Sequence, residues 1–177
     1  MALQSDFWVG LGREATWGTA VTPTTFLFGT GKIALEVQTT DGKGYRPSTR
    51  AVDAARHTVT RHKVSGDVSD MDAVIPGGLK VLLEAAFGVV ATDVVDATKG
   101  IKQHLFGPLT GDCLPSFTIQ QSTPRVGCGT ASDVATFAGC QCTSLKLSGK
   151  SGELLGVETS WVGKSQSFVG SVGVPSY

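Results

Sequence analysis

The sequence predicts a mainly β protein: two packed antiparallel sheets (a β-sandwich or open barrel) with one flanking α-helix and a long loop between early strands. Three observations lead to this prediction. β-Branched residues are abundant, and glycine accounts for 23 of the 177 residues, a composition typical of strands joined by turns. Several segments alternate apolar and polar residues with a period of two. A single segment has convincing helical periodicity.

The opening residues are expected to form an irregular arm that lies over the rest of the protein. Small residues permit tight backbone paths, Trp17 can anchor the segment, and Pro23 prevents a helix. The stretch 1–6 has neither the basic region nor the apolar core of a signal peptide. We therefore expect residues 1–177 to form a single domain with an N-terminal arm, 1–30, and a C-terminal arm, 163–177.

The first regular strand is expected over 31–40, where Ile33, Leu35, Val37 and Thr39 share one face of a half-buried strand. A polar loop rich in glycine and basic residues follows over 41–56. It is longer than an ordinary connection, and ordered loops of this length are usually functional.

A second strand is expected over 57–69. The apolar parity switches between Val59 and Val64, which predicts a bulge or bend near 61–63. The only convincing helix follows over 78–87, between Pro76-Gly77-Gly78 and Gly88. Its apolar stripe predicts a helix packed on a sheet. The stretch 91–100 is expected to be a loop or a short edge segment.

The last third contains three expected strands, 116–120, 137–148 and 153–162. The last two form a hairpin around the turn 149–152. Leu145 and Leu147 are expected to face inward. One face of the final strand carries Leu155, Val157, Thr159 and Trp161.

No residue pattern indicates catalysis or a cofactor. The Gly-Lys-Ser triplets at 149–151 and 163–165 lack the earlier glycine of a phosphate-binding loop, because Ser144 and Glu158 occupy that position. A Gly-x-Ser-x-Gly nucleophile elbow does not occur. The chain is therefore not expected to be an enzyme or to bind a cofactor.

No metal site is expected either. His57 and His62 are five residues apart in a predicted strand, so they point to opposite faces unless a bulge intervenes. The four cysteines, Cys113, Cys128, Cys140 and Cys142, form no Cys-x-x-Cys pair. They are expected to be small buried thiols of a protein made in a reducing cytoplasm, with a disulfide in an assembled particle as the open alternative.

The charge distribution points to self-association. Lys+Arg and Asp+Glu are equal at 15 each, which argues against a general binder of nucleic acid or anionic membranes. Residues 41–63 carry six basic and two acidic groups, whereas 64–99 carry six acidic and two basic groups. Such adjacent blocks suit docking between copies of the chain, or they compensate each other within one chain. The candidate interface residues are Lys43, Arg46, Arg50, Arg56, Asp67, Asp70 and Asp72.

One family resemblance unites these features. The opening pattern of Gly12, Glu14, Trp17, Gly18, Thr19, Val21 and Pro23 resembles the start of tail tube proteins (major tail proteins) of long-tailed bacteriophages. The middle of the family is similar to 64–68 followed by 78–88. Its closing portion is similar to 116–119, 137–140 and 143–148. The resemblance covers roughly Gly12 to Val162.

This resemblance implies structural work in a virion. Such proteins form rings, usually of six subunits, which stack into the tube through which DNA leaves the phage head. Strands of two packed sheets join between subunits around the lumen, and a long loop, here 41–56, reaches the neighbouring ring. The implied partners are further copies of the chain, the tape measure protein, the tail terminator and the baseplate or initiator. The implied location is the phage tail, assembled in the host cytoplasm, with no membrane partner.

A lumen that passes double-stranded DNA without specific binding should be acidic or neutral, because lysine and arginine bind phosphate strongly. Glu36 and Glu158, on the polar faces of two expected strands, are the lumenal candidates. The alternative function is a soluble β-sandwich module that binds carbohydrate or protein. Such a module needs exposed aromatic residues on one face, and Trp8, Trp17 and Trp161 are scattered along the chain.

Overall fold

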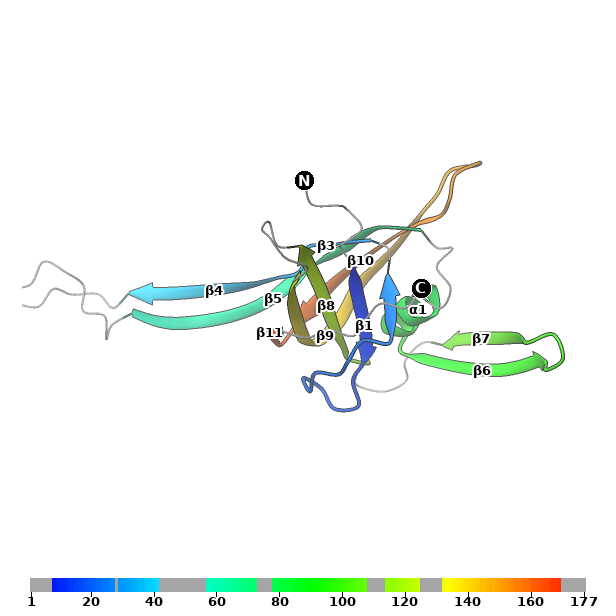
Figure 1. Cartoon of the computed structure of the whole chain (residues 1–177), viewed down its shortest axis with the longest axis horizontal. Coiled ribbons are helices and arrows are strands. Elements are labelled where there is room, and N and C mark those ends of the chain that lie inside the picture. The colour runs from blue at the N-terminus through cyan, green and yellow to red at the C-terminus, as the bar shows by residue number, and fades with distance from the viewer. Residues whose placement is uncertain are drawn as a thin grey trace, which may run out of the picture.

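The computed structural model describes residues 8–27, 29–41, 57–72, 78–107, 114–124 and 132–169. Over these residues the predicted fold class is confirmed: the chain is mainly β, with two packed sheets, one flanking helix and no closed barrel (Figure 1). The helix is α1, Gly78–Phe87. The strands are β1 (Val9–Arg13), β2 (Thr25–Leu27), β3 (Thr30–Gly31), β4 (Ala34–Asp41), β5 (His57–Asp72), β6 (Val89–Asp96), β7 (Ile101–Gly107), β8 (Phe117–Pro124), β9 (Ser132–Ser148), β10 (Gly156–Gly163) and β11 (Ser165–Val169).

Two antiparallel sheets share the long strand β9. Sheet A has the order β2-β1-β8-β9-β11 and uses the first part of β9. Sheet B has the order β9-β10-β5, with β3 and β4 following one another along the far side of β5, and uses the second part of β9. Gly139 lies at the register shift where β9 leaves β8, and its φ of 68° is a conformation that favours glycine. Because of this bend, the single strand β9 belongs to both sheets.

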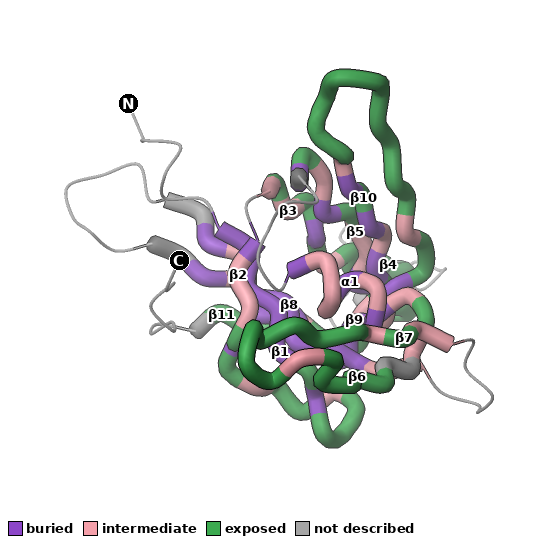
Figure 2. Tube along the Cα trace, turned by 90° about the vertical axis from the view of Figure 1, so that its right-hand side faces the viewer, coloured by how far each residue is buried: buried purple, intermediate pink, exposed green. Residues whose placement is uncertain are grey.

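The core lies between the sheets, where buried residues from both sides meet (Figure 2). Phe117 of sheet A and Trp161 of sheet B pack edge to face, with ring centroids 6.0 Å apart. The indole Nε1 of Trp161 donates a 2.8 Å hydrogen bond to the Thr159 hydroxyl, so its polar atom is satisfied inside the core. The helix α1 contributes Leu82 and Ala85 to the same core.

Gly66 explains why a glycine occupies the middle of a long strand. A Cβ at this position would collide with the backbone of Lys32 and Ile33. The backbone N–H of Lys32 donates a 2.8 Å hydrogen bond to the Asp67 carbonyl. The connection from β3 to β4 therefore packs directly against the backbone of β5.

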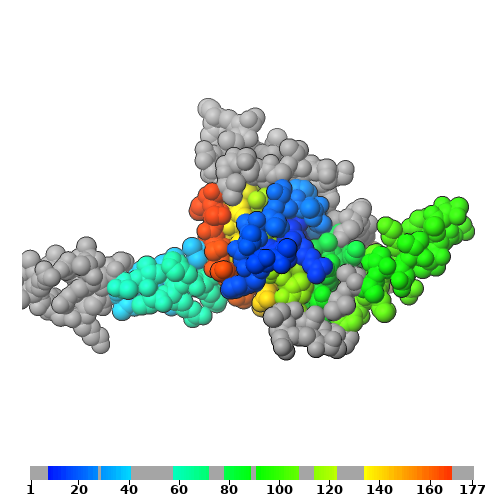
Figure 3. All heavy atoms as spheres, turned by 90° about the horizontal axis from the view of Figure 1, so that it is seen from below, coloured from blue at the N-terminus to red at the C-terminus, as the bar shows by residue number. Residues whose placement is uncertain are grey.

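Three hairpins project from the sandwich (Figure 1). The β4–β5 hairpin extends from one end of the long axis, and the β6–β7 hairpin extends from the other end, as the space-filling view also shows (Figure 3). The outer part of the β9–β10 hairpin leaves the body on the same side as β6–β7. These projections carry much of the exposed apolar surface.

Several sequence predictions are confirmed. The helix spans the predicted residues, and the last two expected strands form the β9–β10 hairpin. The parity switch in β5 does reflect a bulge: the register shift opposite Gln38 and Thr39 leaves Thr60 as the extra residue, one position before the predicted stretch. The Thr60 hydroxyl donates a 3.1 Å hydrogen bond to the Gln38 carbonyl there.

Other predictions are wrong. The stretch 91–100, expected to be a loop or a short edge segment, contains most of β6 and the turn of the β6–β7 hairpin, in which backbone N–H groups donate to the Asp96 carboxylate. The opening residues are not an irregular arm throughout, because β1 pairs with β8 and places Val9 and Leu11 in the core. The closing segment likewise contains β11, which pairs with β9. In each case strand pairing within the folded chain outweighs a weak local pattern.

The end of one strand also differs from the prediction. The strand expected over 57–69 runs on to Asp72, so Asp70 and Asp72 also belong to β5. The register shifts at Asp70, whose φ is 59°, so this residue marks a bulge within the strand.

Candidate assembly surfaces

The outer face of sheet B is a continuous polar surface. The register pairs Glu36 of β4 with Lys63 of β5, and Glu158 of β10 with Lys146 of β9. Asp67 pairs with Ser160, which places the polar residues of all four strands on the same side. The two residues predicted to be lumenal, Glu36 and Glu158, therefore share one face of one sheet.

Charges on this face are balanced. The described residues supply the cations Lys32, Arg61, Lys63 and Lys146 and the anions Glu36, Asp67, Asp70 and Glu158. The Lys146 Nζ lies 2.9 Å from the Glu158 Oε2, with both side chains at least half exposed. An exposed pair of this kind contributes under about 1 kcal/mol to stability. The pair therefore neutralises charge locally on the surface of the sheet and adds little rigidity to it.

The inner face of sheet B is buried only in its middle. There Val64, Val68 and Trp161 lie beneath sheet A and are at most 1% exposed. Towards the β4–β5 end, Val37 and Val59 continue the same apolar face but are each 45% exposed. Leu147, which was predicted to face inward, lies on the other overhang and is also exposed, as is Leu155. The sheet is thus longer than the layer that covers it.

Both lateral edges of sheet B are open within the described residues. β4 pairs only with β5, and the second part of β9, 141–148, pairs only with β10. Open edges present unpaired backbone N–H and C=O groups, which invite another strand. The sheet therefore has two complementary attachment lines on opposite sides.

Glu14 ties the opening segment to the sandwich, and sequence reasoning did not assign it this role. Its side chain is buried and accepts three hydrogen bonds of 2.8 Å, from the Gly18 N–H, the Thr118 hydroxyl and the Gly139 N–H. A buried carboxylate is tolerated when such donors replace water. The only sequence signal for this role was the place of Glu14 in the opening pattern.

Trp17, the residue predicted to anchor the opening segment, lies on the surface and is 55% exposed. The Lys164 ammonium sits 4.4 Å from the centre of its indole ring, a cation–π contact. This contact joins the segment to the residue before β11. The burial that holds the segment in place belongs to Glu14 and to the core residues of β1.

An ion pair also links the helix α1 to the end of β1. The Arg13 guanidinium at the end of β1 forms an ion pair with the Glu84 carboxylate, which is largely buried in α1. Arg13 itself is mostly exposed, so the pair remains partly solvated. The pair links the end of β1 in sheet A to α1, the element that directly precedes β6.

The two described cysteines are buried thiols, as predicted. Cys140 and Cys142 are free and belong to the core cluster. Burial raises the pKa of Cys140 to about 12, with a further contribution from the Glu14 charge. Burial also raises the pKa of Cys142 to about 11. Both groups are therefore protonated and unreactive at neutral pH.

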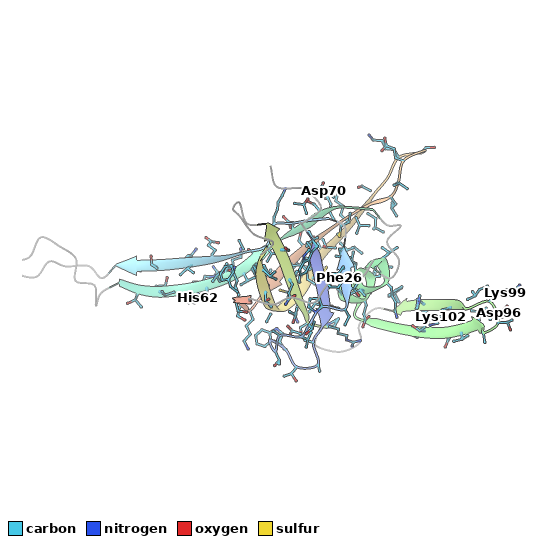
Figure 4. The ribbon with its side chains drawn as sticks, viewed as in Figure 1. Phe26, His62, Asp70, Asp96, Lys99 and Lys102 are labelled. Carbon is cyan, nitrogen blue, oxygen red and sulfur yellow. The ribbon has the colours of Figure 1, made fainter. Side chains whose placement is uncertain are left out.

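The predicted interface residues divide into two groups. Lys43, Arg46, Arg50 and Arg56 lie outside the described residues. Asp67 and Asp70 lie on the outer face of sheet B, and Asp72 ends β5. Asp70 lies over the body of the molecule, whereas His62 lies on the projecting β4–β5 hairpin (Figure 4).

Among the described residues, no three histidine, cysteine or acidic side chains are grouped closely enough to hold a metal ion. In the same part of the chain, no helix is long and apolar enough to cross a membrane. Two of the three tryptophans, Trp8 and Trp161, are buried, and the third, Trp17, is exposed.

Comparison with protein-family models and solved structures identifies the family of this chain. No curated protein matches the sequence. The SPP1 tail tube has the same fold with a TM-score of 0.54 at 10% identity, over 97% of this chain and 80% of that chain. A chain of the anti-feeding prophage baseplate aligns with a TM-score of 0.47 at 8% identity, over 96% of both chains. The family model described as phage tail tube protein matches residues 9–177. The chain therefore belongs to the phage tail tube protein family and has a structural role in the tail tube.

Proposed function

We propose that this chain is the repeating subunit of a tail tube, in which copies join edge to edge through sheet B into rings, with six copies in a ring. The rings stack head to tail into a conduit for double-stranded DNA during ejection into the host. In this proposal the protein is a non-catalytic virion component without a cofactor. It assembles in the bacterial cytoplasm and contacts the tape measure protein, the tail terminator and the baseplate or initiator.

The observation that carries the proposal is the construction of sheet B. One face is polar and balanced in charge, the opposite face is apolar, and both lateral edges are open. Pairing β4 of one copy with the second part of β9 of the next satisfies both open edges. Because the two edges differ, the association is heterologous, and it ends only when the copies close a ring.

The polar face of sheet B lines the lumen in this arrangement. Glu36 and Glu158 then face the DNA on a surface whose described residues carry four cationic and four anionic groups in all. A surface without excess lysine or arginine does not accumulate phosphate contacts, so DNA slides past it. The apolar face points outward and is covered by sheet A and α1.

Stacking of rings involves the basic stretch between β4 and β5. We propose that Lys43, Arg46, Arg50 and Arg56 meet acidic groups of a neighbouring subunit, with Asp67, Asp70 and Asp72 as the candidates. Trp17, exposed beside Lys164, is proposed to hold the opening segment where it contacts a neighbour. Opposite charges steer the association and fix its register.

Electron microscopy and sedimentation of the concentrated protein test the proposal directly. Rings or hollow tubes of uniform diameter support it, whereas a chain that stays monomeric, alone and with a tail initiator complex, contradicts it. Amide hydrogen exchange then tests the edges. Assembly should protect peptides from 34–41 and 141–148, whereas Thr25–Leu27, on the edge of sheet A, should change less. Unchanged exchange at both edges of sheet B would rule out this mode of pairing.

A further inference from the structure

The β6–β7 hairpin is a two-stranded sheet that extends away from the sandwich. Within the described residues its strands pair only with each other, and the element that it mainly contacts is α1 at its root (Figure 1). Isolated two-stranded hairpins are only marginally stable in water. This hairpin nevertheless carries large exposed apolar side chains, including Leu105 and Ile101.

The register assigns these side chains to faces. Ala91 pairs with Leu105, and the alternation along β7 places Ile101 on the same side as Leu105. The opposite face carries Val94, Lys102 and the hydrogen-bonded pair Thr92 and His104. One face of the hairpin therefore has an apolar strip formed by Ala91, Leu105 and Ile101, with Asp93 and Gln103 between them and Asp96 opposite Ile101.

A second uncovered apolar strip lies at the other end of the molecule. Val37 and Val59 share the inner face of the β4–β5 hairpin with His62, beyond the layer formed by sheet A. The alternation that buries Ile33 in the core thus continues into a part of the strand that this chain alone leaves exposed. Period-two apolar residues indicate a face that is covered in the working state.

The two strips are complementary in position. They lie at opposite ends of the long axis, so they meet when identical copies stack end to end (Figure 3). Viewed from the β6–β7 end, the β9–β10 and β6–β7 hairpins lie on either side of α1 (Figure 2). His62 accompanies one strip, and Asp93 accompanies the other.

We infer that the β6–β7 hairpin of one copy covers the Val37–Val59 strip of the β4–β5 hairpin of a second copy in the next ring. This inference rests on the proposed tube function and names the surface that receives the β4–β5 hairpin. Leu105 and Ile101 pack on Val37 and Val59, so each subunit supplies one strip at each end. The two strips differ, so the contact joins unlike ends of neighbouring subunits and gives the stack a direction.

Charge substitutions on the two faces of the β6–β7 hairpin test the inference. Leu105→Asp places a charge in the contact and should reduce pelletable tubes about tenfold or more. Burying an unpaired charge costs well over the free energy that corresponds to a tenfold change in association. Val94→Asp is the matched control, because Val94 is 59% exposed against 63% for Leu105 and lies on the opposite face of the same hairpin. It should leave tube formation unchanged.

A compensating change separates contact from folding. Val37→Lys should also reduce tubes, and Val37→Lys combined with Leu105→Asp should restore them, because the new lysine and aspartate meet between copies. Normal thermal unfolding of the monomers shows that each variant folds. Equal polymerisation of wild type and Leu105→Asp, or equal loss in Leu105→Asp and Val94→Asp, overturns the inference. Wild-type rings that never stack overturn this contact and leave ring formation standing, whereas absence of both rings and tubes contradicts the proposed function.

Discussion

Glu14 and Gly139, separated by 125 positions in the sequence, are joined by a 2.8 Å hydrogen bond from the Gly139 backbone N–H to the Glu14 Oε1. Gly139 is the bend where β9 passes from sheet A to sheet B. The opening segment is thus fastened to the point that joins the two sheets. The same carboxylate also binds Gly18 and Thr118, so a single side chain holds the segment against β8 and β9.

Replacing Glu14 should destabilise the monomer. Glu14→Ala leaves three donors without their acceptor and should lower the free energy of unfolding by about 2–4 kcal/mol. Glu14→Gln keeps the shape but turns an N–H group toward a donor, so a loss of about 1–3 kcal/mol is expected. Urea unfolding measures both values. Glu36→Gln, on an exposed strand position, should change stability by less than about 0.5 kcal/mol, and a similar value for Glu14→Gln would contradict this role.

Gly139→Ala should be more harmful than a glycine substitution of similar backbone strain. The new Cβ would lie 2.8 Å from the Lys164 Cβ and 3.2 Å from the Trp17 Nε1. Gly152 has φ of 88° with nothing within 4 Å of an added Cβ, so Gly152→Ala carries the conformational cost alone, about 1–2 kcal/mol. Thermal unfolding of both variants isolates the packing contribution. Equal losses would mean that the contacts around Gly139 relax freely.

Reversing charge on the polar face of sheet B should make assembled tubes bind DNA. Glu36→Lys combined with Glu158→Lys leaves the core untouched, because both residues are exposed. Tubes of this variant should retain double-stranded DNA at low salt and release it as salt rises, since phosphate binding by lysine depends steeply on ionic strength. Wild-type tubes should not retain DNA, and a Glu36→Gln, Glu158→Gln variant, which removes the two anions without adding lysine, should retain less DNA than the lysine variant. If the lysine variant also fails to bind, the polar face of sheet B does not line the lumen.

Charge reversal in the stretch between β4 and β5 should weaken the stack. Arg46→Glu together with Arg50→Glu should shorten tubes and lower their thermal stability, because like charges then face Asp67 and Asp70. Adding Asp67→Arg and Asp70→Arg to the same chain should recover tube length. If tube length and thermal stability are unchanged in the Arg46→Glu, Arg50→Glu variant, these residues do not contribute to the contact between rings.

The buried thiols predict a specific pH dependence. Their pKa values are raised from 9.0 to about 12 for Cys140 and about 11 for Cys142, so the folded state keeps its protons while the unfolded state loses them. The contribution is fully present below pH 9 and is lost as pH rises towards the folded values, by about 1.4 kcal/mol per thiol at about pH 10.

Urea unfolding of the wild type between about pH 8 and about pH 10.5 should therefore show a steeper decline than unfolding of Cys140→Ala, Cys142→Ala. Iodoacetamide at neutral pH should modify neither thiol until the protein is unfolded. Rapid modification of the native monomer would show that the two residues are accessible.

The sequence determined the parts of this protein that depend on local pattern. Helical spacing of Leu79, Leu82 and Ala86 sufficed for α1, and alternation sufficed for β4, β5 and the β9–β10 hairpin. The parity switch in β5 revealed its bulge because one extra residue reverses every later side chain. The opening pattern, together with the order and spacing of the middle and closing segments, also indicated the tail tube family.

Only the tertiary structure decided which strands pair and which apolar residues remain uncovered. β1 and β11 are short, and each is defined as a strand by pairing with another segment, β1 with β8 and β11 with β9. No local sequence pattern therefore marks them as strands. Glu14 became a structural acceptor only when Gly18, Thr118 and Gly139 converged on it. Val37 looks like a core residue in the sequence, yet the chain leaves it exposed, because burial depends on where the covering layer ends.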